Sequence, residues 1–568
     1  MYSLISRMDR SSTPRPSKLI DLLIVFVFFI LGIWLVVLRP LGFHLQLVPG
    51  DLGDARFNNY ILEHFFRFIS GATKDYWNAP FFFPYQQTTA FSDTLLGSAP
   101  IYVLFRLIGL GRVSAFQGWY ILAFVLDFTS ASFILRRLKL QPLAIGIGAF
   151  FFTFGLPLLA QENHAQLLYC FCIPLACYAL WRFYQFPRLK TLLILGVWLV
   201  WQVYLSIYIG IFLFFLLVIL FILIPLFEAK LSIVQRLVCW PQRLIKAWYE
   251  ATLRSRLLAI SALIGLTICF IFLFLPYYHV SRLYGFTRSW VEVSAMLPRL
   301  QSYLIADNSQ IWSSISNIFP SMSLRWEHQL FPGLAVILFI LVGVIGRFQT
   351  ENRKLAWINL TAAFILLLLT LYTHGFSLYK FIYQLPGLGS LRAVTRIMLV
   401  MMWPIALFIA WAVDGFLQCY HQHRRWMQVL MYLLAGLLVL ESTFYTHSTY
   451  DKAVAEQRLD TLRQQFPTAI PADPVLYIAQ NPKDPWTTTE IDAMLLSQEL
   501  GWSTINGYSG NFPPGYSSAD SCQQLPAIIK QYMEFTGKTD VSFYLASMKR
   551  VVPIGFTDCN PSGWVKMP

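Results

Sequence analysis

Charged side chains are scarce in this chain of 568 residues, where Asp, Glu, Lys and Arg together make up 13%. A soluble globular protein usually carries about 25%. Hydrophobic residues make up 57%, and many lie in runs long enough to cross a bilayer of roughly 30 Å. These properties exclude a chain of ordinary soluble domains and predict an all-α polytopic membrane protein.

Several common sequence motifs are also absent. There is no P-loop, no Rossmann glycine fingerprint and no kinase or hydrolase motif, which argues against ATP-driven transport by this chain alone. No zinc or haem motif is present, and no internal repeat is found. The formal charge of +14 does not indicate nucleic-acid binding, because the basic residues form short clusters between apolar runs, as cytoplasmic membrane anchors do.

Cysteine is sparse, at eight residues. Six of them lie in or beside apolar runs or in a basic loop and are expected to be free thiols: Cys170, Cys172, Cys177, Cys239, Cys269 and Cys419. Cys522 and Cys559 lie together in a polar C-terminal tail. In an oxidising compartment they would form a disulfide, and the alternative is a pair of reduced, buried thiols.

The apolar runs predict about eleven transmembrane helices, at 19–38, 114–135, 143–160, 165–184, 190–207, 208–227, 257–276, 331–346, 355–373, 396–418 and 427–445. Four basic residues precede the first run: Arg7, Arg10, Arg15 and Lys18. That run is too long for the apolar core of a signal peptide, so we expect an uncleaved helix with a cytoplasmic N-terminus.

A further apolar stretch, 94–111, decides the topology. If it crosses the membrane, the basic cluster Arg136, Arg137 and Lys139 and the basic loop 228–256 both fall outside. If it lies at the outer interface, every strong basic cluster falls inside, including those at 182–190, 347–354 and 424–425. We therefore predict a surface helix at 94–111 and an extracytoplasmic C-terminus.

Two domains follow from this topology. Residues 1–446 are expected to form the transmembrane domain, with a first outer loop at 39–113. Residues 447–568 are expected to form a small α/β domain outside the cytoplasm, with a strand-like run at Val475–Ala479 and a helical pattern at Glu490–Leu500.

The first outer loop opens with Pro49-Gly-Asp-Leu-Gly-Asp-Ala-Arg-Phe-Asn-Asn-Tyr60. Asp51 and Asp54 are three residues apart, so they would share a face if a helix begins here. A carboxylate just outside the membrane can act as a general base for a hydroxyl group, or with a second acid can bind a divalent ion. The alternative is that one of the two caps the helix that follows.

A second polar cluster, Gln161-Glu-Asn-His-Ala-Gln166, separates two apolar runs and falls on the same predicted side. Glu162 and His164 are ionisable groups at the membrane edge, which are often functional when they face a bundle interior. The alternative is a polar turn that faces water.

Three more residues on that side are candidates for substrate binding. Asp93 precedes 94–111, where it can equally cap that helix. Arg392 and Arg396 are four residues apart, would project together on a helix, and suit a lipid phosphate or pyrophosphate. Their alternative role is an ion pair with an outer acid.

The acidic motif directly after the first helix resembles that of the GT-C superfamily of membrane glycosyltransferases, which includes oligosaccharyltransferases and protein O-mannosyltransferases. Asp51 and Asp54 match the first-loop motif, and Glu162 stands where the oligosaccharyltransferases carry a second, paired acidic motif, although here the pair is replaced by Glu-Asn-His. The stretches 78–84, 391–396 and 508–516 resemble bacterial multi-pass proteins related to this superfamily, which implies the bacterial inner membrane.

The resemblance implies a cell-envelope glycosyltransferase that moves a sugar from a polyprenyl-phosphate lipid to an acceptor (a glycan, lipid or protein) with inversion. Asp51 or Asp54 would be the base, Asp93, Glu162 and His164 would contact substrates, and Arg392 and Arg396 would neutralise the donor phosphate. A Mg or Mn ion held by Asp51, Asp54 and Glu162 is an open alternative. So are two other classes of protein, a flippase of lipid-linked glycans and a non-catalytic envelope assembly protein.

Overall fold

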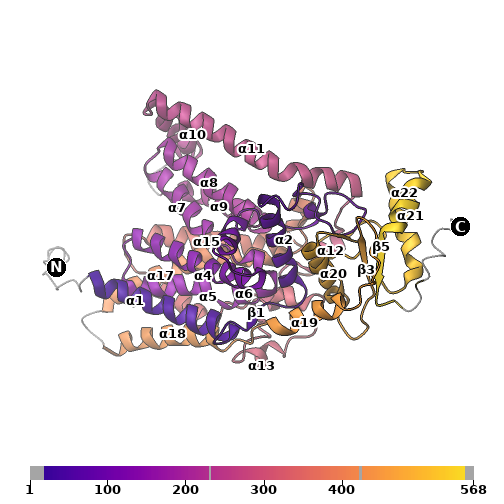
Figure 1. The fold of residues 1–568 in the computed structure, drawn as a ribbon. Helices are drawn as coiled ribbons and strands as arrows, with labels where there is room; N and C mark the ends of the chain where they lie inside the picture. The colour runs from indigo at the N-terminus through magenta and orange to yellow at the C-terminus, as the bar shows by residue number, and fades with distance from the viewer. Residues whose placement is uncertain (1–17, 229–231, 421–424, 557–558, 560–568) are drawn as a thin grey trace, which may run out of the picture.

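A computed structural model describes residues 18–228, 232–420, 425–556 and 559. The predictions made for Arg7, Arg10, Arg15, Lys230 and Arg424 lie outside these ranges. Within them, nine helices are long and apolar enough to cross a membrane, and two shorter apolar helices accompany them. Small strands join a C-terminal unit to one end of this bundle (Figure 1).

Each of the eleven predicted spans coincides with helix. The helices concerned are α1 (Lys18–Gly32, continued to Leu38), α4 (Arg112–Arg137), α5 (Pro142–Phe154), α7 (Cys172–Gln185), α8 (Leu189–Leu205), α9 (Ile207–Leu226), α11 (Leu253–Tyr284), α14 (Leu334–Gly346), α15 (Arg353–Thr370), α17 (Ile397–Tyr420) and α18 (Arg425–Thr443). The predicted division of 190–227 falls at Ser206, whose extended backbone separates α8 from α9. The all-α polytopic class is therefore correct.

The stretch 94–111 contains one short helix, α3 (Ala99–Leu107). Nine residues of α-helix are only about 13 Å long, which is less than half of the bilayer core. This segment is therefore too short to cross the membrane as a helix, which agrees with the surface helix predicted from the basic clusters.

The bundle is organised around α17, whose apolar window is completely buried. Helices α5, α14, α15 and α9 pack around it. Gly148 of α5 allows a close approach to α17, because a Cβ at that position would lie 2.9 Å from the Cβ of Ala410.

The basic loops gather at one end of the bundle. Asn352 donates a hydrogen bond to the carbonyl of Leu138 at 2.8 Å, Lys354 pairs with Glu228, and the guanidinium of Arg243 lies 3.9 Å from the ring centre of Tyr184. Helix α10 (Ile233–Tyr249) lies at this end, opposite the C-terminal strands (Figure 1). The clusters that the sequence assigns to the cytoplasm thus share one end.

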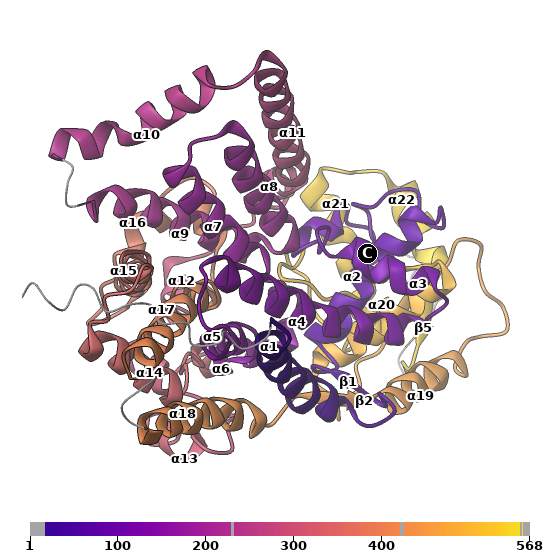
Figure 2. The same ribbon diagram turned by 90° about the vertical axis from the view of Figure 1, so that its left-hand side faces the viewer.

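The C-terminal unit holds a three-stranded parallel sheet in the order β4 (Ser503–Thr504), β3 (Val475–Ile478), β5 (Val551–Ile554). Its helices are α19 (Lys452–Arg463), α20 (Trp486–Leu500), α21 (Leu525–Thr536) and α22 (Val541–Arg550). The predicted strand at 475–479 and the helical pattern at 490–500 are both present. In Figure 1 the sheet and the helices α20, α21 and α22 lie to the right of the outer-loop helix α2 (Asp54–Ile69), and in Figure 2 α2 overlaps this unit in the view along the bundle.

Contacts of several kinds join this unit to the first outer loop, among them a strand pair and a buried ion pair. Strand β1 (Leu47–Pro49) pairs antiparallel with β2 (Thr449–Asp451). Arg56 of α2 forms a buried ion pair with Asp492 of α20 at 2.6 Å. The tail is therefore held directly over the segment that carries Asp51 and Asp54.

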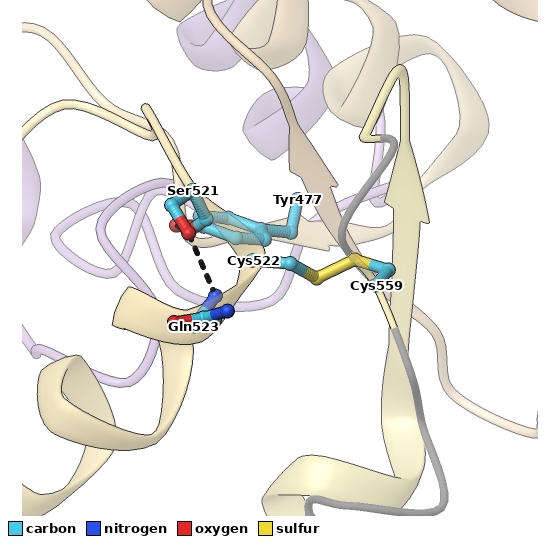
Figure 3. Close-up of a disulfide and its surroundings, with 5 residues drawn as sticks. All are labelled: Tyr477, Ser521, Cys522, Gln523 and Cys559. Atoms are coloured by element: carbon cyan, nitrogen blue, oxygen red, sulfur yellow. Dashed lines mark hydrogen bonds between the residues drawn. A yellow bond between two sulfur atoms is a disulfide. The ribbon is translucent and has the colours of Figure 1, made fainter.

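Cys522 and Cys559 form a disulfide that ties the segment after β5 to the start of α21 (Figure 3). Tyr477 of β3 lies beside it and donates a hydrogen bond to the carbonyl of Ser521 at 3.2 Å. The six other cysteines are free thiols, four of them buried.

Candidate active site

The two aspartates of the first loop have different surroundings. Helix α2 begins at Asp54, so Asp51 precedes the helix and the condition for a shared helical face is not met. Oδ1 of Asp51 accepts hydrogen bonds from the backbone N–H groups of Gly53 and Ala55, at 3.1 and 3.3 Å. Burial, and then the neighbouring Asp54 carboxylate, raise the pKa of Asp51. Asp51 therefore organises the start of α2, where a carboxylate is also favoured by the helix dipole.

Asp54 instead points into a cavity at the outer end of the bundle. The hydroxyl of Tyr508, from the tail, donates a hydrogen bond to its Oδ1 at 2.8 Å. Nδ1 of His164 lies 3.4 Å from its Oδ2. The Asp54 side chain is 29% exposed, so this carboxylate is held on two sides and remains open to a substrate on a third.

His164 joins Asp54 to a second acid that the sequence did not single out. Its Nε2 lies 3.5 Å from Oε1 of Glu327, which is 5% exposed. Arg396 makes two hydrogen bonds to the same carboxylate, at 2.8 and 3.3 Å. Burial by itself raises the pKa of Glu327, but Arg396 and His164 outweigh it and hold the pKa well below its ordinary value.

Arg392 and Arg396 do not project together, because α17 begins only at Ile397 and Arg392 lies outside any helix before it. Arg392 contacts Glu292 at 3.3 Å, whereas Arg396 pairs with Glu327 and lies 5.2 Å from the ring centre of Tyr208. Each arginine thus has the outer-acid partner that the sequence left as an alternative, and each also lines the cavity.

Arg288 supplies a third cation on the same wall. It pairs with Glu292 at 3.0 Å and donates to the carbonyl of Gly510 and to Oδ1 of Asn511, both at 2.6 Å. Burial, and then the nearby positive charge of Arg392, lower its pKa. Because Gly510 and Asn511 belong to the tail, Arg288 ties the loop that carries Tyr508 to the membrane domain.

These residues surround a polar cavity of about 210 Å³, which we call the central cavity. Its polar lining includes Asp54, Asn58, Asp93, His164, Gln166, Tyr208, Arg288, Arg392, Arg396, Tyr508 and Asn511. The central cavity adjoins an apolar groove of about 850 Å³ between α8, α9 and α11. Six residues line both spaces: Ile207, Tyr277, Arg288, Ser390, Leu391 and Asn511.

The apolar groove faces the region that lipid would occupy. Its lining includes Phe214 and Phe270, which are 51% and 46% exposed, and Phe274 of α11. Helix α11 packs on α8 and leaves most of its surface uncovered, with 11% of its apolar window buried. A helix that is apolar on all sides lies either in a protein core or in a membrane, so the uncovered faces of α11 indicate contact with hydrocarbon.

Asp93 lines the central cavity but does not cap the helix that it was predicted to cap. Helix α3 begins six residues later, at Ala99. The Asp93 carboxylate instead accepts hydrogen bonds from the hydroxyl of Ser206 at 3.1 Å and the N–H of Ile207 at 3.2 Å. It therefore caps α9, a partner that is distant in sequence. Burial raises its pKa.

Glu162 and His164 diverge although they are two residues apart. Non-helical backbone angles at His164 turn its ring toward Asp54. The Glu162 carboxylate accepts hydrogen bonds from Nδ1 of His447, at 2.9 Å, and from the N–H of Ser448. Glu162 does not line the central cavity and instead secures the chain just before β2.

The proposed metal ligands do not fit together. Asp51 and Glu162 direct their carboxylates to backbone and histidine donors, and Asp54 faces Tyr508 and His164. In the part of the chain that the structure describes, no group of three or more His, Cys, Asp or Glu side chains could hold a metal ion. Nothing in this arrangement lets a catalytic step be assigned to a metal.

Sequence reasoning missed Glu327, Arg288, Tyr208 and the role of Tyr508. A signal was available for Arg288, because it is an arginine on the outer side, which was the reason for selecting Arg392 and Arg396. Tyr508 belongs to the Gly/Pro/aromatic stretch that the sequence highlighted. Glu327 lies in the long segment between helices α11 and α14, and no pattern distinguishes it there.

No protein-family model matches the chain, and no curated protein matches it. Among solved structures it is similar to the arabinofuranosyltransferase AftD from Mycobacteria, with 12% identity and a TM-score of 0.48 over 84% of this chain and 30% of that one. It is also similar to the oligosaccharyltransferase of Archaeoglobus fulgidus in its apo form (12% identity, TM-score 0.47, 86% and 65% of the two chains).

A structure of the oligosaccharyltransferase AglB from Archaeoglobus fulgidus, in complex with an inhibitory peptide and a dolichol-phosphate, matches with 12% identity and a TM-score of 0.48, over 86% and 64% of the two chains. The chain thus spans about a third of the first protein and just under two thirds of the second. A function for this chain has to be derived from the geometry of its own site.

Proposed function

We propose that this protein is a membrane glycosyltransferase that moves a sugar from a polyprenyl-phosphate lipid to a hydroxyl acceptor in the central cavity. The observation that carries the proposal is that three features meet in one place: the Asp54 carboxylate, the wall formed by Arg288 and Arg392, and the apolar groove that adjoins the central cavity. Each feature matches one part of the reaction, namely the acceptor, the donor phosphate and the donor chain.

The acceptor would bind beside Asp54. Asp54 is the base of choice over Asp51, because it lines the cavity and is partly open, whereas Asp51 is engaged with the backbone of α2. The phenol of Tyr508 already donates to Asp54, so the position next to Oδ1 accommodates a hydroxyl donor. The tail, which supplies Tyr508 and Asn511, would shape the acceptor site.

The donor phosphate would bind against Arg392 and Arg288. These two share one carboxylate, Glu292, so two guanidinium groups face a single negative charge at this wall. Arg396 is matched by Glu327 and serves mainly to fix that wall and His164 in place. A surplus of positive charge beside the leaving phosphate stabilises the charge that develops in the transition state.

The reaction would be a direct displacement. Asp54 takes the proton of the acceptor hydroxyl as the acceptor oxygen attacks the anomeric carbon. The bond from that carbon to the phosphate oxygen breaks, and its electron pair leaves with the polyprenyl phosphate. Attack from the face opposite the leaving group inverts the anomeric centre. His164, which links Asp54 to Glu327, holds the base in position.

The prenyl chain would lie in the apolar groove between α9 and α11. The groove begins at the residues that line both spaces, so a phosphate at Arg288 places its lipid tail in continuous apolar surroundings. With the basic clusters in the cytoplasm, the cavity would open on the outer face of a bacterial inner membrane, and the acceptor would be a glycan, lipid or protein of the envelope.

The test is transfer by the full-length protein in liposomes that contain short-chain polyprenyl-phosphate donors, each carrying one labelled sugar. Asp54→Asn should lower transfer by about 10²–10⁴-fold, the usual contribution of a general base. Asp51→Asn is the matched control, because it changes an acid three residues away that does not line the cavity, and it should retain transfer.

Transfer that persists when Asp54 and Asp51 are both neutralised would refute the catalytic role. Movement of the donor between leaflets without sugar transfer would instead identify a flippase, the alternative that shares the groove and the arginines. Transfer that is unchanged by a chelator would show that no Mg or Mn ion is required.

A further inference from the structure

A second polar cavity lies at the outer end of α4, apart from the central cavity. Its volume is about 460 Å³, and side chains from α2, α3, the start of α4, α19 and α20 line it. None of its lining residues lines the central cavity. It therefore has no part in the proposed transfer reaction, and we call it the α4 pocket.

Positive charge is in excess in the α4 pocket. Arg106 is neutralised by Glu63, with Nε 3.0 Å from the carboxylate. The side chains of Arg67 and Arg112 form no ion pair or hydrogen bond with any residue that the structure describes. Lys452 donates to the neutral hydroxyl of Ser114 at 2.6 Å. Three cations of the pocket thus lack an anionic partner.

The remaining acids of the pocket are already paired. Glu499 accepts two hydrogen bonds from Arg463, both at 2.6 Å, and Glu456 lies 3.4 Å from the same guanidinium. Arg463 lies outside the lining and also pairs with a third acid, Asp460. The lining itself has four basic side chains (Arg67, Arg106, Arg112 and Lys452) against three acids (Glu63, Glu456 and Glu499), so a net positive charge remains that an anion from elsewhere would balance.

The pocket lies where the outer lipid headgroups would be. Helix α4 crosses the membrane and ends at Arg136 and Arg137 in the basic end of the bundle, so its first residue, Arg112, lies at the opposite interface. Cations on the outer side run against the usual distribution of charge in membrane proteins. An anionic ligand explains why they are placed here.

Exposed apolar side chains flank the same cavity. Leu104, Leu107 and Ile108, at the end of α3, are 62%, 70% and 74% exposed. The C-terminal end of α2 adds Phe68 and Ile69, at 38% and 50%. Surface helices with this character insert their apolar faces into the headgroup and acyl boundary. A ligand in the α4 pocket would thus have hydrocarbon beside it.

We propose that the α4 pocket binds the phosphate group of an anionic lipid of the outer leaflet. Arg67 and Arg112 would each offer two N–H donors to the phosphate oxygens, a geometry for which guanidinium is suited. Lys452 would add a third charge, and the free N–H groups at the start of α4 would favour an anion there. The acyl chains would lie along α3.

The bound lipid would also link the tail to the membrane. Lys452 follows β2 directly and begins α19, so it moves with the tail, whereas Arg112 belongs to α4. A phosphate held between them would fix the height of the tail above the bilayer. Free phosphate is the other source of the same chemistry, and the apolar flank favours the lipid.

The experiment measures lipid binding by native mass spectrometry of the full-length protein, with phosphatidylglycerol and phosphatidylcholine as probes. The test variant is the triple substitution Arg67→Gln, Arg112→Gln and Lys452→Gln. The control is the triple substitution Lys74→Gln, Lys483→Gln and Lys549→Gln, which removes the same charge from exposed positions outside the pocket. Inorganic phosphate is added in a separate arm as a competitor.

Phosphatidylglycerol should bind the unaltered protein and the control with equal affinity, and the test variant about a hundredfold more weakly, because each basic group near an anionic headgroup contributes about fivefold. Phosphatidylcholine should bind all three proteins weakly. Binding of phosphatidylglycerol that is equal in the test variant and the control would overturn the proposal.

Inorganic phosphate should compete only at far higher concentration than the lipid. If it displaces phosphatidylglycerol at equal concentration, the lipid source is wrong and the pocket is a site for soluble phosphate groups. Arg67→Lys with Arg112→Lys guards against misfolding of the test variant, because it keeps the charge and should restore at least part of the binding.

Discussion

The hydroxyl of Tyr508 donates a hydrogen bond of 2.8 Å to Oδ1 of Asp54, across 454 residues of sequence. Burial, and then the negative charge of Asp54, raise the pKa of this phenol, so it remains a donor. The contact places a side chain of the tail at the point where the proposed acceptor hydroxyl would bind. An acceptor therefore has to displace Tyr508 or share Asp54 with it.

Tyr508→Phe should lower the KM for the acceptor by about tenfold while kcat changes by less than about threefold, because a hydrogen bond to a charged group is worth roughly 1.5–3 kcal/mol and would no longer oppose binding. The measurement is steady-state transfer with varied acceptor. Tyr85→Phe is the control, since its hydroxyl contacts the carbonyl of Pro514. A fall in kcat with unchanged KM would mean that Tyr508 orients the base instead.

Arg396→Met should destabilise the protein by about 3–5 kcal/mol, because it leaves a buried carboxylate without its partner. Glu327 is 5% exposed and Arg396 is 10% exposed. The double variant Arg396→Met, Glu327→Gln removes both charges and should recover most of this loss. The free energy of unfolding in mild detergent measures both effects. Equal stability of the single variant and the unaltered protein would show that the pair is not important for folding.

Stability of the tail should fall as the pH rises from about 4.5 to about 7. Burial raises the pKa of Glu490 to about 7 from its ordinary value of 4.5. The folded tail therefore holds this proton more tightly than the unfolded chain, and the stabilisation is complete below the lower value and lost above the higher one. Glu490 accepts hydrogen bonds at 2.7 Å from the N–H of Gly507 and the hydroxyl of Tyr516, so the effect should appear in the loop that carries Tyr508.

Hydrogen exchange of residues 506–516 at about pH 5 and about pH 7.5 measures this dependence, after correction for the intrinsic effect of pH on exchange. Glu490→Gln should abolish the difference in protection. Glu534→Gln, at an exposed position of α21, is the control and should preserve it. A pH dependence that survives in Glu490→Gln would assign it to another group.

An impermeant thiol reagent added from outside should label Ala72→Cys and should not label Arg137→Cys. Both positions are exposed in the structure, and they lie at opposite ends of the bundle. Cys269 and Cys419 are exposed free thiols and need replacement by serine beforehand. The reverse labelling pattern would invert the topology and would place the central cavity in the cytoplasm.

Local sequence patterns were sufficient to predict those features that depend on interactions within one segment of the chain. Eleven helices follow from runs of apolar residues, because a chain in hydrocarbon must satisfy its backbone polar groups within each segment. The prediction that 94–111 is a surface helix and not a transmembrane helix followed from the positions of lysine and arginine alone. The topology predicted from the sequence also placed Asp54, Asp93, His164, Arg392 and Arg396 on one side of the membrane. All five line the central cavity.

The sequence by itself determined the membrane class, the positions of the eleven apolar helices and the end of the bundle at which the cavity lies, since each depends on composition within a short segment. Only the tertiary structure decided which of the predicted acids faces the cavity. Asp51 and Asp54 are equivalent as a sequence pattern, and so are Glu162 and His164 as ionisable groups of one turn. The start of α2 at Asp54, three residues after Asp51, and the kink at His164 direct the two members of each pair to different partners. Glu327 and Tyr508 reach the site from distant loops, and such contacts depend on how helices pack rather than on any local signal.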